Sequence, residues 1–145
     1  MKMKRDCPDF LFKKLSGSNS VNAVDLINKI IMHGDESLQM KLIDDYKEKL
    51  DILSGMGWRE LAANGTNGVK IRLIRDYQEK LDNNSGAGWY NIIKNGSEAI
   101  HMLLISECQD KLNSGGTRRG WQLLYEYGND AVKDEIEVLI WVNRK

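Results

Sequence analysis

The sequence has little proline or cysteine and no excess of charge of either sign. It holds one proline and two cysteines in 145 residues, and its 21 basic residues equal its 21 acidic residues. Cys7 and Cys108 form neither a disulfide framework nor a metal-ligand spacing, which indicates a reducing compartment. A formal net charge of zero gives no overall field that would attract a polyanion or a membrane. These counts exclude a disulfide-rich scaffold and weaken, without removing, a nucleic-acid-binding function.

Long apolar runs are also absent from the sequence. The basic start of the chain is interrupted by Asp6, Pro8 and Asp9 before any apolar run of signal-peptide length. No stretch approaches the roughly 18 apolar residues that a membrane-spanning helix needs. We therefore expect a cytoplasmic protein with no membrane partner.

What the sequence does contain is a repeated segment. A Gly-Trp pair opens, and a glycine closes, each of the nine-residue segments 57–65, 88–96 and 120–128, and their tryptophans lie 31 and then 32 residues apart. A diverged fourth copy covers residues 24–33 and is closed by Gly34. A period of this length is typical of stacked supersecondary units, none of which can bury its apolar face alone.

The apolar positions around each closing glycine predict two helices per copy. Apolar residues three and four positions before the glycine lie on one helical face, and a stripe at positions 4, 8, 9, 12 and 16 after it covers about four turns. Short helices are predicted over 21–33, 58–63, 89–94 and 121–127, and long ones over 36–51, 67–82, 98–113 and 130–143. Asn64-Gly65 and Asn95-Gly96 are expected to end their helices in left-handed geometry. The position-8 residues are expected to be buried between units: Leu42, Leu73, Leu104 and Ile136.

These elements predict an all-α fold of stacked helical hairpins, with about eight or nine helices and no sheet. Residues 1–145 form a single helical-repeat domain. Its units cover roughly 6–34, 35–65, 66–96 and 97–128, and a C-terminal capping helix covers 129–145.

One copy resembles a known repeat family. The segment Leu61-Ala62-Ala63-Asn64-Gly65, followed by Val69-Lys70 and Leu73-Ile74, is similar to the middle of an ankyrin repeat. No copy has the Thr-Pro-Leu-His entry of that family, the second helix is longer, and the period is shorter than the usual value of about 33. A HEAT-like stack of helical hairpins is the alternative. Either resemblance implies a protein-binding platform rather than an enzyme.

The residues that could carry chemistry have simpler structural interpretations. The repeated tryptophans are predicted to be core wedges rather than a platform for stacking bases, and Trp141 is expected to pack on the last unit. Cys108 shares its repeat position with two tyrosines and is expected to be buried and inert. His33 and His101 are expected in surface or turn positions rather than as metal ligands. No cofactor, metal site or catalytic residue is predicted.

The recognition surface is predicted where equivalent exposed positions differ between copies, because shared residues maintain the fold. The candidate partner-binding residues are Met56, Arg59, Tyr90, Arg118, Arg119 and Gln122. The sequence favours an inhibitor or immunity-type antagonist of one protein partner. The alternative is a nucleic-acid-binding protein that uses a basic stripe, formed by Lys70, Arg72, Arg75, Arg118 and Arg119.

Overall fold

The computed structural model describes residues 2–113 and 120–143, and within these ranges the fold is entirely α-helical, as predicted. The helices are α1 (Lys2–Ser16), α2 (Ser20–Met32), α3 (Glu36–Asp45), α4 (Lys47–Leu50), α5 (Ile52–Asn64), α6 (Asn67–Asp76), α7 (Gln78–Asn95), α8 (Glu98–Glu107), α9 (Gln109–Asn113), α10 (Gly120–Tyr127) and α11 (Asp130–Asn143). None of these helices is long and apolar enough to cross a membrane.

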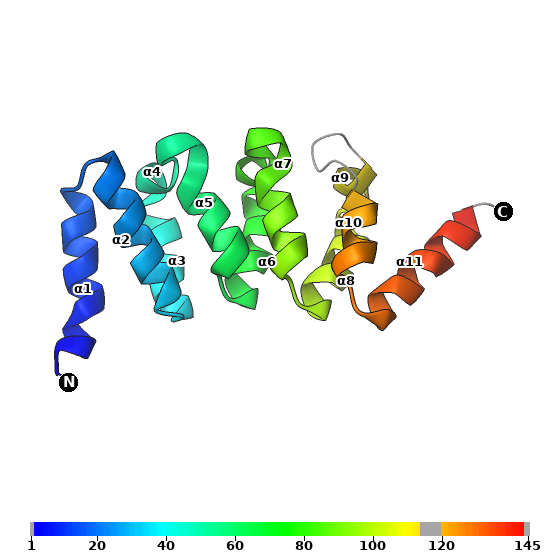
Figure 1. Ribbon diagram of the computed structural model, residues 1–145, viewed down its shortest axis with the longest axis horizontal. Helices are drawn as coiled ribbons and strands as arrows, with labels where there is room; N and C mark the ends of the chain where they lie inside the picture. Colours follow the sequence, from blue (N-terminus) through cyan, green and yellow to red (C-terminus); the bar gives the residue numbers. More distant parts are fainter. Residues whose placement is uncertain (1, 114–119, 144–145) are drawn as a thin grey trace.

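The helices follow one another along the long axis of the molecule, from α1 at one end to α11 at the other (Figure 1). Helices α2, α5, α7 and α10 form one row in which each contacts the next, and α3, α6, α8 and α11 form a second row in the same way. A continuous core runs between the rows from Phe12 to Ile136. The four position-8 residues are all buried, as predicted.

The long helices are not continuous, and the predictions over 36–51, 67–82 and 98–113 are wrong in this respect. Tyr46, Tyr77 and Cys108 interrupt them with nearly identical backbone angles, φ −132°, −133° and −127° and ψ 32°, 39° and 32°. Each of these residues still donates its N–H to the carbonyl four residues earlier, and a new helix starts directly afterwards. An apolar stripe reports only which face is buried, so a bend at one residue leaves the stripe intact. With these breaks, the described residues form eleven helices rather than eight or nine.

The turns between long and short helices have left-handed backbone. Leu53, Ser54 and Gly55 have φ of 54°, 60° and 85° inside α5, and residues 84–86 repeat this geometry inside α7. Side chains with a Cβ pay about 1–2 kcal/mol each in this region. The Ser54 carbonyl offsets part of that cost by accepting hydrogen bonds from Arg59 and Asn84, both at 2.7 Å.

The closing glycines do not behave as predicted. Gly65 and Gly96 are extended, with φ of −70° and −83°, rather than left-handed. Glycine is needed there because of close approach: an added Cβ would lie 2.5 Å from the carbonyl oxygens of Leu61 and Ile92 respectively. The sequence identified the right residues for the wrong physical reason.

The aromatic residues and the cysteine are largely placed as predicted. Trp58 and Trp89 are fully buried, Trp121 is half-buried, and Cys108 is buried. Burial raises the pKa of the Cys108 thiol, so the thiol loses its proton less readily and forms less of the reactive thiolate. Trp141 is 61% exposed on α11, which diverges from α10 in Figure 1.

Candidate interaction surface

Each buried tryptophan is tied to its neighbours by a carboxylate that the sequence reading missed. The indole Nε1 of Trp58 donates to Asp51 Oδ1 at 2.6 Å, and Lys80 from the next copy donates to the same oxygen at 2.9 Å. A similar bridge recurs in the next copy, where Trp89 donates to Asp82 Oδ1 at 2.6 Å and Lys111 donates to the other oxygen, Oδ2, at 2.9 Å. An aspartate seven residues before each tryptophan was the available signal. With their rings buried and their N–H groups engaged, these tryptophans cannot serve as an open stacking platform.

A second recurring position, five residues after each of the first three closing glycines, holds buried polar side chains. Gln39 donates to the Ile31 carbonyl at 3.0 Å and accepts from the Thr66 N–H at 2.9 Å. Lys70 donates to the Asn95 carbonyl at 2.8 Å, and burial lowers its pKa. These contacts satisfy carbonyls at the C-terminal ends of the short helices, which have no partner within the helix.

His101 occupies the same position and corrects the prediction of a surface histidine. It is 2% exposed, and its Nε2 donates to the Ile93 carbonyl at 2.7 Å, since a carbonyl can only accept. His33 is exposed, as expected. A polar residue in a helix normally indicates the solvent side, which is why the sequence placed His101 there. Within the described residues, no group of His, Cys, Asp and Glu side chains is arranged to hold a metal ion.

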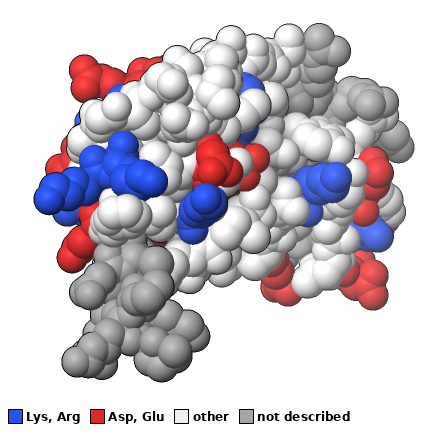
Figure 2. Space-filling view, turned by 60° about the vertical axis from the view of Figure 1, so that its left-hand side comes forward, with Lys and Arg blue, Asp and Glu red and all other residues white. Residues whose placement is uncertain are grey.

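The residues of the basic stripe that the structure describes already have partners within the chain. Lys70 is buried, Arg72 pairs with Asp44 at 2.6 Å, and Arg75 pairs with Glu107 at 3.0 Å. Arg118 and Arg119 lie outside the described residues. On the face shown in Figure 2, basic and acidic side chains are interspersed among large uncharged areas.

The described candidates for partner binding lie on three helices of one row. Met56 and Arg59 are half-buried on α5, and Arg59 donates to the left-handed turn as described above. Tyr90 and Gln122 are exposed and lie on α7 and α10. Helices α5, α7 and α10 contact one another in that order (Figure 1), and Arg59, Tyr90 and Gln122 each lie six residues before a closing glycine. These three residues therefore occupy equivalent positions on successive helices.

Tyr90 is part of an aromatic pair that sequence reasoning did not find. Its ring packs edge-on against Tyr127 of α10, with centroids 6.3 Å apart, and their hydroxyl oxygens are 3.4 Å apart. The hydrogen bond with Tyr90 is the main cause that raises the pKa of Tyr127 to about 12. Lys94 lies 5.8 Å from the Tyr90 ring centroid, over its face. The pair therefore gives the α7–α10 boundary an exposed aromatic surface beside a positive charge.

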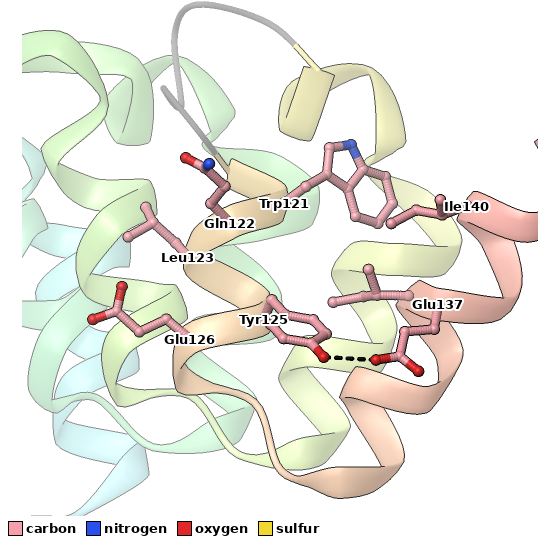
Figure 3. A pocket seen from close by; sticks show the side chains of 8 residues that line it. Trp121, Gln122, Leu123, Tyr125, Glu126, Glu137 and Ile140 are labelled. Atoms are coloured by element: carbon pink, nitrogen blue, oxygen red, sulfur yellow. Dashed lines mark hydrogen bonds between the residues drawn. The ribbon is translucent and has the colours of Figure 1, made fainter.

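A groove of about 620 Å³ lies between α10 and α11. Trp121 and Tyr125 of α10 point toward Ile140 and Glu137 of α11 (Figure 3). The Tyr125 hydroxyl donates to Glu137 Oε2 at 2.6 Å across the groove, and this hydrogen bond raises the pKa of Tyr125. The groove is lined by Trp121, Gln122, Leu123, Tyr125, Glu126, Ile136, Glu137 and Ile140. Of the predicted partner-binding residues, Gln122 is the one that lines it.

The sequence contained a signal for this groove. Three positions before the closing glycine, the apolar residues of the first three copies become Tyr125, and nine positions after it, isoleucine becomes Glu137. A change from apolar residues to a tyrosine and a glutamate at core positions indicates a face that meets water. Comparison with known protein families, with curated proteins and with solved structures gives no significant match, so the site rests on its own geometry.

Proposed function

We propose that this chain is a small, non-catalytic, cytoplasmic protein-binding module, built as a stack of helical repeats, that acts as an inhibitor or immunity-type antagonist of one protein partner. The observation that carries the proposal is the open groove between α10 and α11, which exposes Tyr125 and Ile140 by 42% and 49%. Apolar surface hollowed in this way and edged by polar groups is typical of protein-interaction sites. The exposed Tyr90–Tyr127 pair adds a second aromatic anchor nearby.

The repeat architecture is supported by recurrences about 31 residues apart. The helix break, the left-handed turn and the tryptophan–aspartate bridge each return at equivalent positions. We favour an ankyrin-like stack over a HEAT-like one. The break at Tyr77 shortens the helix after the closing glycine to the ten residues of α6, which lessens the departure in helix length from the ankyrin pattern.

Nucleic-acid binding on the basic stripe has less support. Lys70, Arg72 and Arg75 already have partners within the chain, so binding a phosphate would require breaking those contacts. A gel shift in about 50 mM salt, where phosphate contacts are strongest, distinguishes the two functions. Binding of duplex or single-stranded nucleic acid under that condition would replace the protein-partner proposal.

The direct test is affinity co-purification of the tagged 145-residue protein from its native host, followed by reconstitution with the purified partner. We expect one protein in a 1:1 complex. Tyr90→Ala should weaken that complex by more than about 1 kcal/mol, as expected for loss of an aromatic anchor. The matched control is Glu48→Ala on the exposed side of α4, which should bind normally. Failure to recover any stoichiometric partner would refute the proposed function.

A further inference from the structure

The groove between α10 and α11 exposes positions that are covered everywhere else in the stack. The residues equivalent to Tyr125 are Ile31, Ala62 and Ile93, which are 1%, 0% and 0% exposed. The residues equivalent to Glu137 are Ile43, Ile74 and Ile105, which are 0%, 1% and 4% exposed. Glu137 itself is exposed, and Tyr125 is 42% exposed. Within the described residues, the side chains at these two repeat positions are therefore buried in the first three copies and exposed only at α10 and α11.

In the row of α2, α5, α7 and α10, each helix that carries one of Ile31, Ala62 and Ile93 contacts the next helix of the row, whereas α3 and α6, which carry Ile43 and Ile74, contact the next helix of the second row. Helix α5 contacts both α2 and α4, and α10 contacts both α7 and α9. Thus α5 and α10 each lie against the preceding helix of the first row, and each also contacts the helix just before it in the chain, α4 or α9. Within the described residues no further helix of this row follows α10, so the place beside Tyr125 suits a helix of the same size and apolar spacing.

The electrostatics of the groove specify the charge of the occupant. Glu126 lines the groove from α10 and Glu137 from α11 (Figure 3). The residues that line the groove include these two carboxylates and no basic side chain, and Lys133 lies over the Tyr125 ring at 5.7 Å from its centroid. A helix with basic residues beside its apolar stripe complements this surface.

We propose that the groove between α10 and α11 binds a short, basic, amphipathic helix of a partner protein, in the place that a further short helix of the stack would take. This inference rests on the proposed function and names the part of the partner that is recognised. Apolar side chains three and four residues apart contact Tyr125 and Ile140, and basic side chains lie beside Glu126 and Glu137. The Tyr125–Glu137 hydrogen bond keeps this face compatible with water when the partner is absent.

The probe is a helix-stapled, fluorescein-labelled peptide with the sequence of residues 87–97 of this chain, which contains a short helix with its tryptophan, two isoleucines and one lysine. Anisotropy with the full protein should give saturable 1:1 binding. Ile140→Glu should weaken binding at least tenfold, and the matched control Val21→Glu, at a 75% exposed position on α2, should leave it unchanged. A peptide with both isoleucines replaced by serine should not bind.

The charge requirement is tested separately with Glu126→Gln and Glu137→Gln combined, since glutamine at 137 still offers an oxygen to Tyr125. This variant should bind the peptide severalfold more weakly at low salt and should lose most of the salt dependence. Unchanged binding would overturn the basic character of the occupant.

Three results would overturn the inference as a whole. These are absence of saturable peptide binding, binding that is indifferent to Ile140→Glu, and self-association of the free protein in sedimentation velocity that Ile140→Glu abolishes, which would make a second copy the occupant. A co-purified partner that binds the Ile140→Glu protein as tightly as the parent would retain the proposed function and reject this site. The two proposals therefore fail independently.

Discussion

The central and C-terminal copies hold the same tryptophan in different chemical surroundings. Trp89 is fully buried, and its N–H meets a carboxylate, Asp82, that also binds Lys111 of the next copy. Trp121 is half-buried, and its N–H meets the neutral amide of Asn113 at 2.5 Å. In the sequence, the position equivalent to Lys111 in the following copy is Asn143. The carboxylate is thus present where a lysine neutralises it and absent where none follows.

This difference shows how one repeat position adapts to solvent. The Asp82 carboxylate is 37% exposed and is paired with Lys111, which neutralises its charge beside the buried indole. An amide needs only hydrogen bonds and tolerates partial exposure. In the same way, apolar residues of the other copies are replaced on the C-terminal face, which meets water, by the more polar residues Tyr125 and Glu137. Predictions that compare equivalent residues in the two regions test this interpretation directly.

The largest expected effect is on core packing in the central copy. Leu73→Ala should lower the free energy of unfolding by roughly 2–5 kcal/mol, the range for a fully buried leucine. Ile136→Ala, at the same repeat position against the open end, should fall at the low end of that range because fewer neighbours surround it. Urea unfolding followed by circular dichroism measures both. A Leu73→Ala protein that unfolds like the parent would show that the repeat register is wrong.

The next effect concerns the tryptophan bridge. Asp82→Ala leaves the buried indole N–H of Trp89 without its acceptor and should cost about 1–3 kcal/mol. Asn113→Ala should cost clearly less, because half-buried Trp121 can donate to water instead. The same unfolding assay applies, with the two variants as matched controls for each other. Equal losses would mean that exposure does not explain the difference between the two copies.

The smallest effect is a shift in titration at the aromatic pair. The hydrogen bond with Tyr90 raises the pKa of Tyr127 from 10.0 to about 12, so the folded protein holds this proton more tightly than the unfolded chain. The corresponding stabilisation is complete below about pH 10 and is lost as the pH rises toward 12. Tyr90→Phe should bring the pKa of Tyr127 back toward 10, measured by tyrosinate absorbance. Tyr46→Phe, outside the pair, is the control and should leave that late titration in place.

The helical class and the core were predictable because both depend on apolar periodicity, which the repeat samples several times. Leu73 and Trp89 needed no three-dimensional information to be placed in the interior. The breaks at Tyr77 and its equivalents were not predictable from that periodicity, since the backbone can bend at one residue while the buried face stays the same. The extended conformation of Gly65 was missed for a related reason, because a steric requirement and a dihedral requirement select the same amino acid.

The candidate surface was harder to predict than the core. Gln122 was identified because it differs from its equivalents, but the same comparison was not applied to Tyr125, which was treated as part of the apolar face of its helix. Polar residues such as His101 were misplaced because they satisfy backbone carbonyls of another helix, which for His101 is the helix directly before it in the chain. Hydrogen bonds of that kind depend on how helices meet, which a single-helix periodicity does not contain.

The bridge between Asp51 and Lys80 has a further consequence for how the molecule can change in length. The copy at residues 66–96 carries both an acceptor, Asp82, for the lysine that follows and a lysine, Lys80, for the acceptor that precedes it. A tandem duplication of residues 66–96 would therefore supply every new junction with a complete ion pair and a capped tryptophan. The protein could grow by 31-residue steps and keep each aspartate–lysine pair complete. The surface formed by α10 and α11 would remain at the end of the longer molecule.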